Sequence, residues 1–421
     1  MKTSSIALLP SHRASSLSRS QVMARRLLMK LFSRLQWGCL RIHEQGELYQ
    51  FGQSPEKTDL IADIYVHDAQ LYCEVAFSGS IGSGEAYMSG YWSTPNLTAV
   101  MRLFVRNLDA LDAMDSQQSR LGKWVLKLFH WFNRNTREGS RNNISAHYDL
   151  GNEFFKLFLD KSMMYSAAIY PRPDASLAEA AEFKLQRVCE KLQLNEQDHL
   201  LEIGTGWGGL AIHAATHYGC KVTTTTISKE QRDFATAQIN ALGLEDKITV
   251  LFDDYRDLQG QFSKLVSIEM IEAVGHEHYD QYFSICSRLL APNGLMLIQA
   301  ITIADQRYEQ ARQTVDFIQR YIFPGGCLPS IAVIADSVKR NTTMNILQIE
   351  DIGEHYAQTL KHWREAFNGS LEQVRAQGFD ERFIRMWEFY LCYCEGGFIE
   401  RSIGTAQIVF AKSGYRSGYF Q

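Results

Sequence analysis

A glycine-rich segment is the first place where residue types and spacing suggest chemistry. The apolar run 200–203 carries one acid, Glu202, and the turn after it contains Gly204, Thr205, Gly206, Trp207, Gly208 and Gly209. Glycine adopts positive φ angles and lets a ligand approach the backbone. A strand, this turn and a helix from about Leu210 therefore predict a loop that binds a nucleotide-like cofactor. Many strand-to-helix turns need glycine for geometry alone, so the loop by itself leaves both interpretations open.

Further polar residues follow the next two predicted strands. Strand 221–226 ends at Thr226 and leads to Ser228 and Gln231 at a helix start, and the following strand leads to Tyr255 and Arg256. The sequence contains no G-x-x-x-x-G-K-[ST], so a P-loop is not expected. An acid at the front of the glycine turn is typical of enzymes that use S-adenosylmethionine (SAM). We therefore predict SAM as the cofactor.

Two later apolar runs also end in, or contain, polar groups. Glu272 follows the run 265–271, and Gln299 lies within 295–301. An unpartnered charge beside a buried strand is costly, so we favour a functional carboxylate at Glu272 over one that caps a helix or pairs with a cation. For Tyr356, the residues alone support an ordinary core tyrosine nearly as well.

Strands that alternate with helices, and end in polar groups at one edge, predict an α/β fold with a doubly wound, Rossmann-like parallel sheet. The 421 residues exceed one ordinary domain. We expect a smaller N-terminal α+β domain over 1–120, with strands that include 71–75. A basic aromatic segment and linker should follow over 121–144, and a catalytic domain that binds SAM over 145–421, which the family resemblance given below implies to be a SAM-dependent methyltransferase domain.

The composition narrows the function classes. Hydrophobic residues make up 45% and charged residues 21%, which indicates a globular protein. The net charge of −4 and the lack of a base-reading motif do not favour a nucleic-acid partner. The cysteines form no C-x-x-C pair or Cys/His cluster, so we expect no metal site, no disulfide framework and a reducing cytoplasm. No secretory signal or bilayer-spanning segment is expected.

The N-terminal 43 residues contain basic but no acidic side chains. Between the basic residues, apolar ones recur at helical spacing: Val22, Leu27, Leu28, Leu31, Phe32 and Leu35. This pattern predicts a helix on an anionic membrane surface, or equally a surface helix packed on its own domain. The segment 123–134 has a similar character. We expect peripheral association with the inner membrane; the alternative is a subunit interface, and so a homodimer.

Several short motifs, spread over nearly the whole chain, together resemble the cyclopropane fatty-acyl-phospholipid synthase family, which includes mycolic acid cyclopropane synthases and fatty-acid methyltransferases. They are Gly-Glu-Ala-Tyr-Met from 84, His-Tyr-Asp-Leu-Gly-Asn from 147, Tyr-Ser from 165, the glycine loop, Thr-Ile-Ser-x-x-Gln from 226, Tyr-Arg-Asp from 255, Glu-x-Val-Gly from 272, the run 321–330, and Cys-x-Gly-x-Phe from 394.

The resemblance implies which residues bind and which react. Those implied for SAM are Tyr165, Ser166, Glu202, Gly204, Gly206, Trp207, Gly208, Thr226, Ser228, Gln231, Tyr255 and Arg256. Those implied for catalysis are Glu272, Gln299, Tyr356 and Cys394. Of these, Glu272, Gln299 and Tyr356, with Ile301, are implied to form a pocket for a bicarbonate ion that acts as base. The reaction needs no thiol nucleophile, so Cys394 is also consistent with a small buried hydrophobe.

Three positions depart from the family pattern. Ala167 stands where many members carry cysteine, Gln299 where many carry histidine, and Thr205 where cysteine is common. Backbone contacts at Ala167 would survive the change. Gln299 can still donate a hydrogen bond but cannot carry positive charge, so we expect weaker anion binding.

The resemblance implies transfer of the SAM methyl group to the cis double bond of an unsaturated phospholipid acyl chain, which leaves a carbocation. Proton loss from the added methyl closes a cyclopropane, whereas loss from an adjacent carbon gives a methyl-branched alkene. Aromatic candidates for stabilising the cation are Tyr148, Tyr165, Tyr321, Phe323 and Phe398. A methyl-branching enzyme and a catalytically dead lipid-binding paralogue are the alternatives.

Overall fold

The computed structural model describes residues 17–108 and 150–416, which form two compact units. The first unit contains residues 17–108, 314–322 and 363–402, and the second contains 150–313, 323–362 and 403–416. The expected linker at 121–144, its basic segment and Tyr148 lie outside the described residues. Each unit gathers segments that are distant in sequence, so the units do not follow the contiguous domain boundaries expected at residues 120 and 145.

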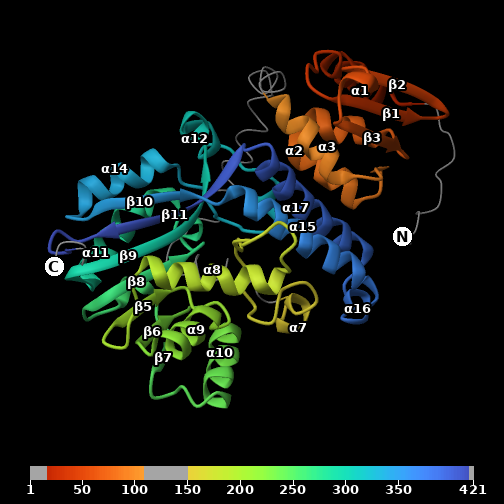
Figure 1. Cartoon of the computed structure of the whole chain (residues 1–421). Helices are drawn as coiled ribbons and strands as arrows, with labels where there is room; N and C mark the ends of the chain where they lie inside the picture. Colours follow the sequence, from red (N-terminus) through yellow and green to blue (C-terminus); the bar gives the residue numbers. More distant parts are fainter. Residues whose placement is uncertain (1–16, 109–149, 417–421) are drawn as a thin grey trace. The chain divides into compact units, whose positions relative to one another are not determined.

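The second unit contains the larger sheet, whose strands are labelled in Figure 1. Its strands are β5 (His199–Ile203), β6 (Lys221–Thr225), β7 (Ile248–Leu251), β8 (Phe262–Ile268), β9 (Leu290–Ile303), β10 (Asn345–Asp351) and β11 (Ile403–Ala411). Its helices are α7 (Asn152–Phe155), α8 (Leu177–Lys191), α9 (Gly209–Tyr218), α10 (Lys229–Ala241), α11 (Tyr279–Leu289), α12 (Asp305–Ala311), α14 (Ile331–Asn341) and the first part of α15 (Gly353–Gly369).

The seven strands of this sheet run in the order β10-β11-β9-β8-β5-β6-β7. Strands β5 to β9 run parallel to one another, while β11 runs antiparallel to both β9 and β10. The strand order reverses between β5 and β8. In open α/β sheets ligands bind at the carboxyl ends of strands beside such a reversal, so this edge is where a site is expected.

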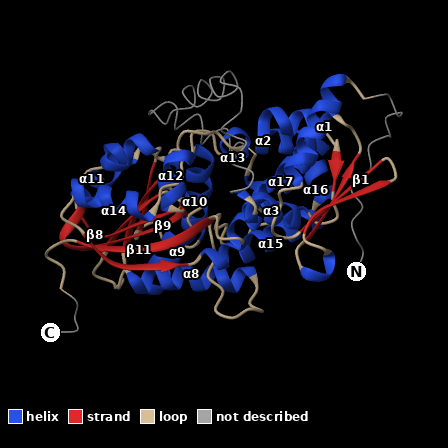
Figure 2. Ribbon diagram, turned by 90° about the horizontal axis from the view of Figure 1, so that it is seen from above, coloured by secondary structure: helices blue, strands red, loops and turns tan. Residues whose placement is uncertain are grey.

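Helices cover both faces of this sheet (Figure 2). Apolar side chains on one face pack against α11 and α14, through residues such as Phe283 and Ile334. Those on the other face pack against α8, α9 and α10, through residues such as Val188 and Ile239. The predicted doubly wound sheet is therefore confirmed.

The first unit is built on a four-stranded sheet of order β2-β1-β3-β4. Its strands are β1 (Cys39–Glu44), β2 (Glu47–Gly52), β3 (Ile61–Val66) and β4 (Trp92–Ser93). Its helices are α1 (Arg19–Phe32), α2 (Gln70–Met88), α3 (Leu97–Arg106), α13 (Phe317–Tyr321), α16 (Leu371–Ala376) and α17 (Glu381–Ile399). The strand expected at 71–75 is wrong, because these residues open α2. A short apolar run does not by itself distinguish a strand from a buried helix.

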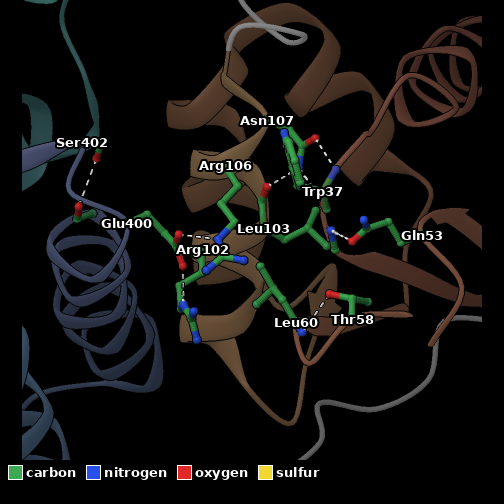
Figure 3. Close-up of polar contacts among 12 residues, drawn as sticks. Trp37, Gln53, Thr58, Leu60, Arg102, Leu103, Arg106, Asn107, Glu400 and Ser402 are labelled. Atoms are coloured by element: carbon green, nitrogen blue, oxygen red, sulfur yellow. Dashed lines mark hydrogen bonds and ion pairs between the residues drawn. The ribbon is translucent and has the colours of Figure 1, made fainter. Parts of the chain in front are cut away.

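Close packing explains why α17 belongs to this unit although it lies far along the chain. A Cβ on Gly396 would lie 2.7 Å from the Cβ of Met101 on α3. The Thr98 hydroxyl donates to Glu395 over 3.0 Å. Glu400, just after α17, forms ion pairs with Arg102 and Arg106, as Figure 3 shows. These contacts attach α17 to α3.

Helix α1 is anchored within the same unit. Leu28 and Phe32 are buried, and Leu35 just after the helix is buried as well. Asn107 holds the turn that follows α1, because its side chain accepts from the Trp37 amide over 3.1 Å and donates to the Trp37 carbonyl over 2.8 Å (Figure 3). Part of the apolar stripe of α1 therefore packs on its own domain.

Candidate active site

The glycine loop lies at the carboxyl end of β5, beside the reversal of strand order. Gly204, Gly206 and Gly208 have φ angles of +100°, +51° and +89°, which L side chains rarely adopt. The amides of Gly204 and Thr205 both donate to the Thr225 carbonyl over 3.0 Å. Gly208, in the left-handed conformation, is the N-cap of α9, so the loop leads directly into a helix N-terminus, where amides favour an anionic group.

Glu202, the acid before the loop, is buried. The Thr224 hydroxyl lies 2.7 Å from its Oε2 and 2.8 Å from the Thr205 hydroxyl. Burial raises the pKa of Glu202 to about 8, while the hydrogen bond from Thr224 and the charge of Lys184 lower it. Thr205 thus has a polar partner that ties the loop to β6.

Ser166 contacts a buried lysine. The Nζ of Lys184, on α8, donates to the Ser166 Oγ over 3.0 Å, and both residues are buried. Burial lowers the pKa of Lys184 to about 8, while the nearby charges of Glu269, Asp160 and Glu202 raise it. The sequence interpretation missed Lys184, although its spacing from Ala180 and Val188 on α8 placed it on the buried face of that helix.

Aromatic rings surround Tyr165. Its ring centroid lies 5.3 Å from that of Phe155 and 6.4 Å from that of Phe323. Phe155 in turn lies 5.0 Å from Trp207 of the glycine loop, whose indole nitrogen donates to Asn152 over 2.7 Å. Tyr165 and Trp207, predicted to bind SAM, are therefore joined through Phe155 in one apolar wall.

Strand β6 presents a second set of predicted cofactor residues just past its carboxyl end. The Thr226 hydroxyl donates to the Gln231 Oε1 over 2.9 Å, and the Ser228 amide donates back to Thr226 Oγ1 over 3.1 Å. The Ser228 hydroxyl accepts from the Gln231 amide over 3.3 Å and so caps α10. All three residues are buried.

The residues after β7 are fixed by an ion pair. Arg256 donates through two nitrogens to Asp254, over 2.8 and 2.6 Å. This two-point contact sets the plane of the guanidinium group. The ring of the neighbouring Tyr255 packs against Tyr282 with centroids 5.6 Å apart. The segment that carries Tyr255 and Arg256 is thus held to the core.

The carboxylate of Glu269 lies among groups that the family resemblance implies for the catalytic pocket. Its Oε1 accepts from the Ala167 amide over 2.9 Å and from the Gln299 side chain over 2.7 Å. Its Oε2 accepts from the Tyr356 hydroxyl over 2.8 Å. Glu269 directly follows β8 and has a φ of +49°. The sequence interpretation missed this residue; its place at the carboxyl end of a buried strand was the available signal.

Glu272 lies close by, in a short turn after β8. Its Oε1 accepts from the Ile301 amide of β9, and its Oε2 is buried without a hydrogen-bond partner among residues 17–108 and 150–416. Burial, and then the charge of Glu269, raise the pKa of Glu272 to about 8. Two carboxyl groups with different partners therefore lie near the ends of β8 and β9.

The structure brings Glu272, Gln299 and Tyr356 into the same unit as the predicted SAM residues. Cys394 instead lies on α17 in the other unit, where burial raises the pKa of its thiol and disfavours a thiolate.

Among the aromatic candidates, Tyr165 and Phe323 contact each other. Tyr321 donates to Glu85 within the first unit, and Phe398 is buried on α17. Tyr321 therefore has a structural partner in that unit.

The chain was compared with known proteins. Residues 135–408 match the family model described as mycolic acid cyclopropane synthetase. The tuberculostearic acid methyltransferase of Mycobacterium tuberculosis is 38% identical over 354 residues, which cover 80% of each chain. The cyclopropane-fatty-acyl-phospholipid synthase of Escherichia coli K12 is 37% identical over 354 residues, which cover 83% of this chain and 88% of that protein.

A solved mycolic acid cyclopropane synthase, in complex with SAH and CTAB, superimposes with a TM-score of 0.61. It is 31% identical and covers 65% of this chain and 98% of its own. SAH is the product that SAM leaves after methyl transfer, and the glycine loop with its positive φ angles fits such a cofactor. The chain therefore belongs to the mycolic acid cyclopropane synthetase family and is a SAM-dependent methyltransferase.

Proposed function

We propose that this methyltransferase acts on the cis double bond of an unsaturated phospholipid acyl chain. The observation that carries the proposal is the pair of carboxyl groups, Glu269 and Glu272, at the ends of β8 and β9 in the unit that carries the SAM residues. An electron-rich double bond becomes cationic when it takes up a methyl group. Negative charge in a site shielded from water stabilises such a cation, and Glu269 is the member of the pair whose ionised form three hydrogen bonds and the charge of Lys184 favour.

When bound, SAM supplies an electrophilic methyl group. The residues of this chain have three tasks. The glycine loop and the Ser228-capped helix hold the cofactor, because their backbone amides lie at helix N-termini. The rings of Tyr165, Phe155 and Phe323 shield a cation from water and offer π faces to it. A base among the polar groups takes up the proton that must leave.

We infer a cyclopropane as the main product, with a methyl-branched chain as the second candidate. The two relatives reported above support one outcome each, since one is named a cyclopropane synthase and the other a tuberculostearic acid methyltransferase. Both outcomes use the same methyl transfer and differ only in which carbon loses its proton. The position of the base therefore decides between them.

The test is fatty-acid analysis of cells that express the chain. Gas chromatography with mass spectrometry should detect acyl chains heavier by one CH₂ unit, and extraction by lipid class should place them in phospholipids. Mild hydrogenation separates the products, because an alkene takes up hydrogen and a cyclopropane ring does not. Absence of new acyl chains while SAH still binds would contradict this substrate and favour the lipid-binding alternative.

We also propose an anionic bilayer as the surface from which the substrate is taken. One face of α1 is exposed and carries no acid; it consists of Arg19, Met23, Arg26, Leu27 and Lys30, with Arg34 just beyond the helix. Met23 and Leu27 are 71% and 43% exposed. Cations interleaved with exposed apolar side chains suit an anionic lipid surface. No helix within the described ranges is long and apolar enough to cross a bilayer.

A further inference from the structure

The proposed reaction needs a base, and one acidic side chain is bound to the residues predicted for catalysis. The family resemblance implies a bicarbonate ion held by residues that include Gln299 and Tyr356, with the Ala167 backbone nearby. In this protein, the Gln299 amide, the Tyr356 hydroxyl and the Ala167 N–H all donate to the two oxygens of Glu269. A carboxylate and a bicarbonate both present two oxygens in one plane. The residues present therefore do not fit a bicarbonate ion in addition to Glu269, because the three hydrogen-bond donors that would hold the ion are already bound to Glu269.

We propose that Glu269 is a built-in replacement for bicarbonate and is the base of the reaction. This inference rests on the proposed methyl transfer to an acyl chain. It assigns the base to a side chain of the protein, so the enzyme would need no dissolved anion for turnover.

The backbone at Glu269 supports this assignment independently. Its φ of +49° belongs to the left-handed region, which a residue with a Cβ adopts only at a cost in free energy. Glycine would adopt the same conformation without that cost. A strained residue that is held by three hydrogen bonds is typical of a functional position.

The surrounding charges suit a base. Burial raises the pKa of Glu269, while the bonds from Gln299, Ala167 and Tyr356 and the charge of Lys184 lower it. Glu272 is a second acid close by, and the charge of Glu269 raises its pKa. A carboxylate with a pKa above its usual range is a stronger base than one on the surface, yet Lys184 favours its ionised form.

The proposed step conserves atoms and charge. After methyl transfer the acyl chain carries one positive charge. One oxygen of Glu269 forms an O–H bond with a proton from the added methyl group, for a cyclopropane, or from a carbon next to the cationic centre, for an alkene, and that C–H bond breaks. Its electron pair closes the cyclopropane ring or forms a double bond, so the chain becomes neutral. The carboxyl group, now also neutral, returns its proton to water before the next cycle.

A structural alternative must be separated from this role. Glu269 also ties the segment around Ala167 to β9 through Gln299, and that contact alone could account for its bonds. Glu269→Gly removes the side chain, relieves the backbone and frees the three donors for a bicarbonate ion. Glu269→Gln keeps a side chain of the same shape that cannot accept a proton in this way. Gln193→Gly is the matched control, because exposed Gln193 has a φ of +54° at the end of α8.

The experiment measures turnover on vesicles that contain unsaturated phospholipid, in carbonate-depleted buffer and with added sodium bicarbonate. We expect the wild type and Gln193→Gly to have the same rate in both buffers. Glu269→Gly should be slower by roughly 10²- to 10⁴-fold without bicarbonate and should recover on its addition. Glu269→Gln should be slow in both. A wild type that needs bicarbonate, or a Glu269→Gly variant at full rate in the depleted buffer, would overturn the proposal.

A second readout does not depend on turnover. Line broadening of ¹³C-labelled bicarbonate in NMR spectra should be absent with the wild type and present with Glu269→Gly. Equal broadening by both proteins would contradict the inference even if the enzyme were fully active. A wild type that makes no lipid product but shows the expected broadening pattern would refute the proposed substrate and leave the occupancy of this site by Glu269 supported.

Discussion

Gln407 on β11 stands directly opposite Gln299 on β9, and its side-chain amide donates to the Gln299 Oε1 over 2.9 Å. Both residues are buried. Because the oxygen of Gln299 is taken by Gln407, its nitrogen points toward Glu269. Gln407 in turn accepts from Lys191 over 2.5 Å. A polar chain through the sheet thus sets the orientation of the amide that binds Glu269.

Gln407→Leu should separate this orienting role from simple packing. It leaves the Gln299 oxygen buried without a donor, which costs about 1–3 kcal/mol of unfolding free energy. We expect kcat to fall several-fold and the affinity for SAH to stay unchanged, since the glycine loop is untouched. Urea unfolding, kinetics and calorimetry measure the three quantities. Gln348→Leu, at an exposed position of the neighbouring β10, is the control. An unchanged kcat for Gln407→Leu would show that the hydrogen bond from Gln407 to Gln299 has no part in the mechanism.

The loop and the sheet edge could be predicted from sequence because local signals define them. Glycines at 204, 206 and 208 and apolar runs at 200–203 and 265–268 specify a strand, a turn and a helix wherever they occur. The edge near which Glu272 and Gln299 both lie then follows from parallel strands in a doubly wound sheet.

Two features were beyond such signals. The choice between Glu269 and Glu272 depends on the turn after β8, whose left-handed residue 269 is a glutamate and so is not marked in the sequence. The packing of α17 on α3 depends on contacts such as Thr98 to Glu395, between residues nearly 300 positions apart. Neither local propensity nor periodicity contains that information, and only the folded chain reveals it.

Cofactor binding should depend on the positive φ of the glycine loop. Gly206→Val forces a β-branched residue into a left-handed conformation at a cost of about 1–3 kcal/mol. We expect the affinity for SAH, measured by calorimetry, to fall at least about tenfold. Gly243→Val is a matched control, because Gly243 also has a positive φ of +64° and a Cβ there would meet nothing within 4 Å. Equal SAH affinities of the two folded variants would contradict the assignment of this loop to cofactor binding.

Membrane binding should follow the charge of α1. Each basic residue near an anionic surface contributes about 1 kcal/mol, so reversing Arg26, Lys30 and Arg34 to glutamate should weaken vesicle binding by at least roughly 100-fold. Flotation with anionic and zwitterionic vesicles at rising salt measures this. Reversal of Lys221, Lys247 and Lys339, which are exposed in the other unit, is the charge-matched control. Vesicle binding that does not depend on salt or on the α1 charges, or no binding, would instead assign this face to internal packing or to a subunit interface.

Glu272 gives the last prediction, which concerns stability and pH. Its pKa is raised from 4.5 to about 8 in the folded protein, chiefly by burial and then by the charge of Glu269. The folded state therefore binds this proton more tightly than the unfolded state. The contribution of Glu272 to the free energy of unfolding is fully present below pH 4.5 and is lost as the pH rises to about 8.

Glu272→Gln cannot ionise, so its stability relative to the wild type should increase with pH. We expect a gain of about 1–3 kcal/mol between about pH 5 and pH 8, measured by urea unfolding at both values. Glu245→Gln, at an exposed position, should show no such trend. Glu269 and Tyr279 are the titratable groups coupled to Glu272, so the series is repeated in a Glu269→Gln background. There the gain should shrink, because the like charge has been removed; an undiminished gain would show that burial alone raises the pKa of Glu272.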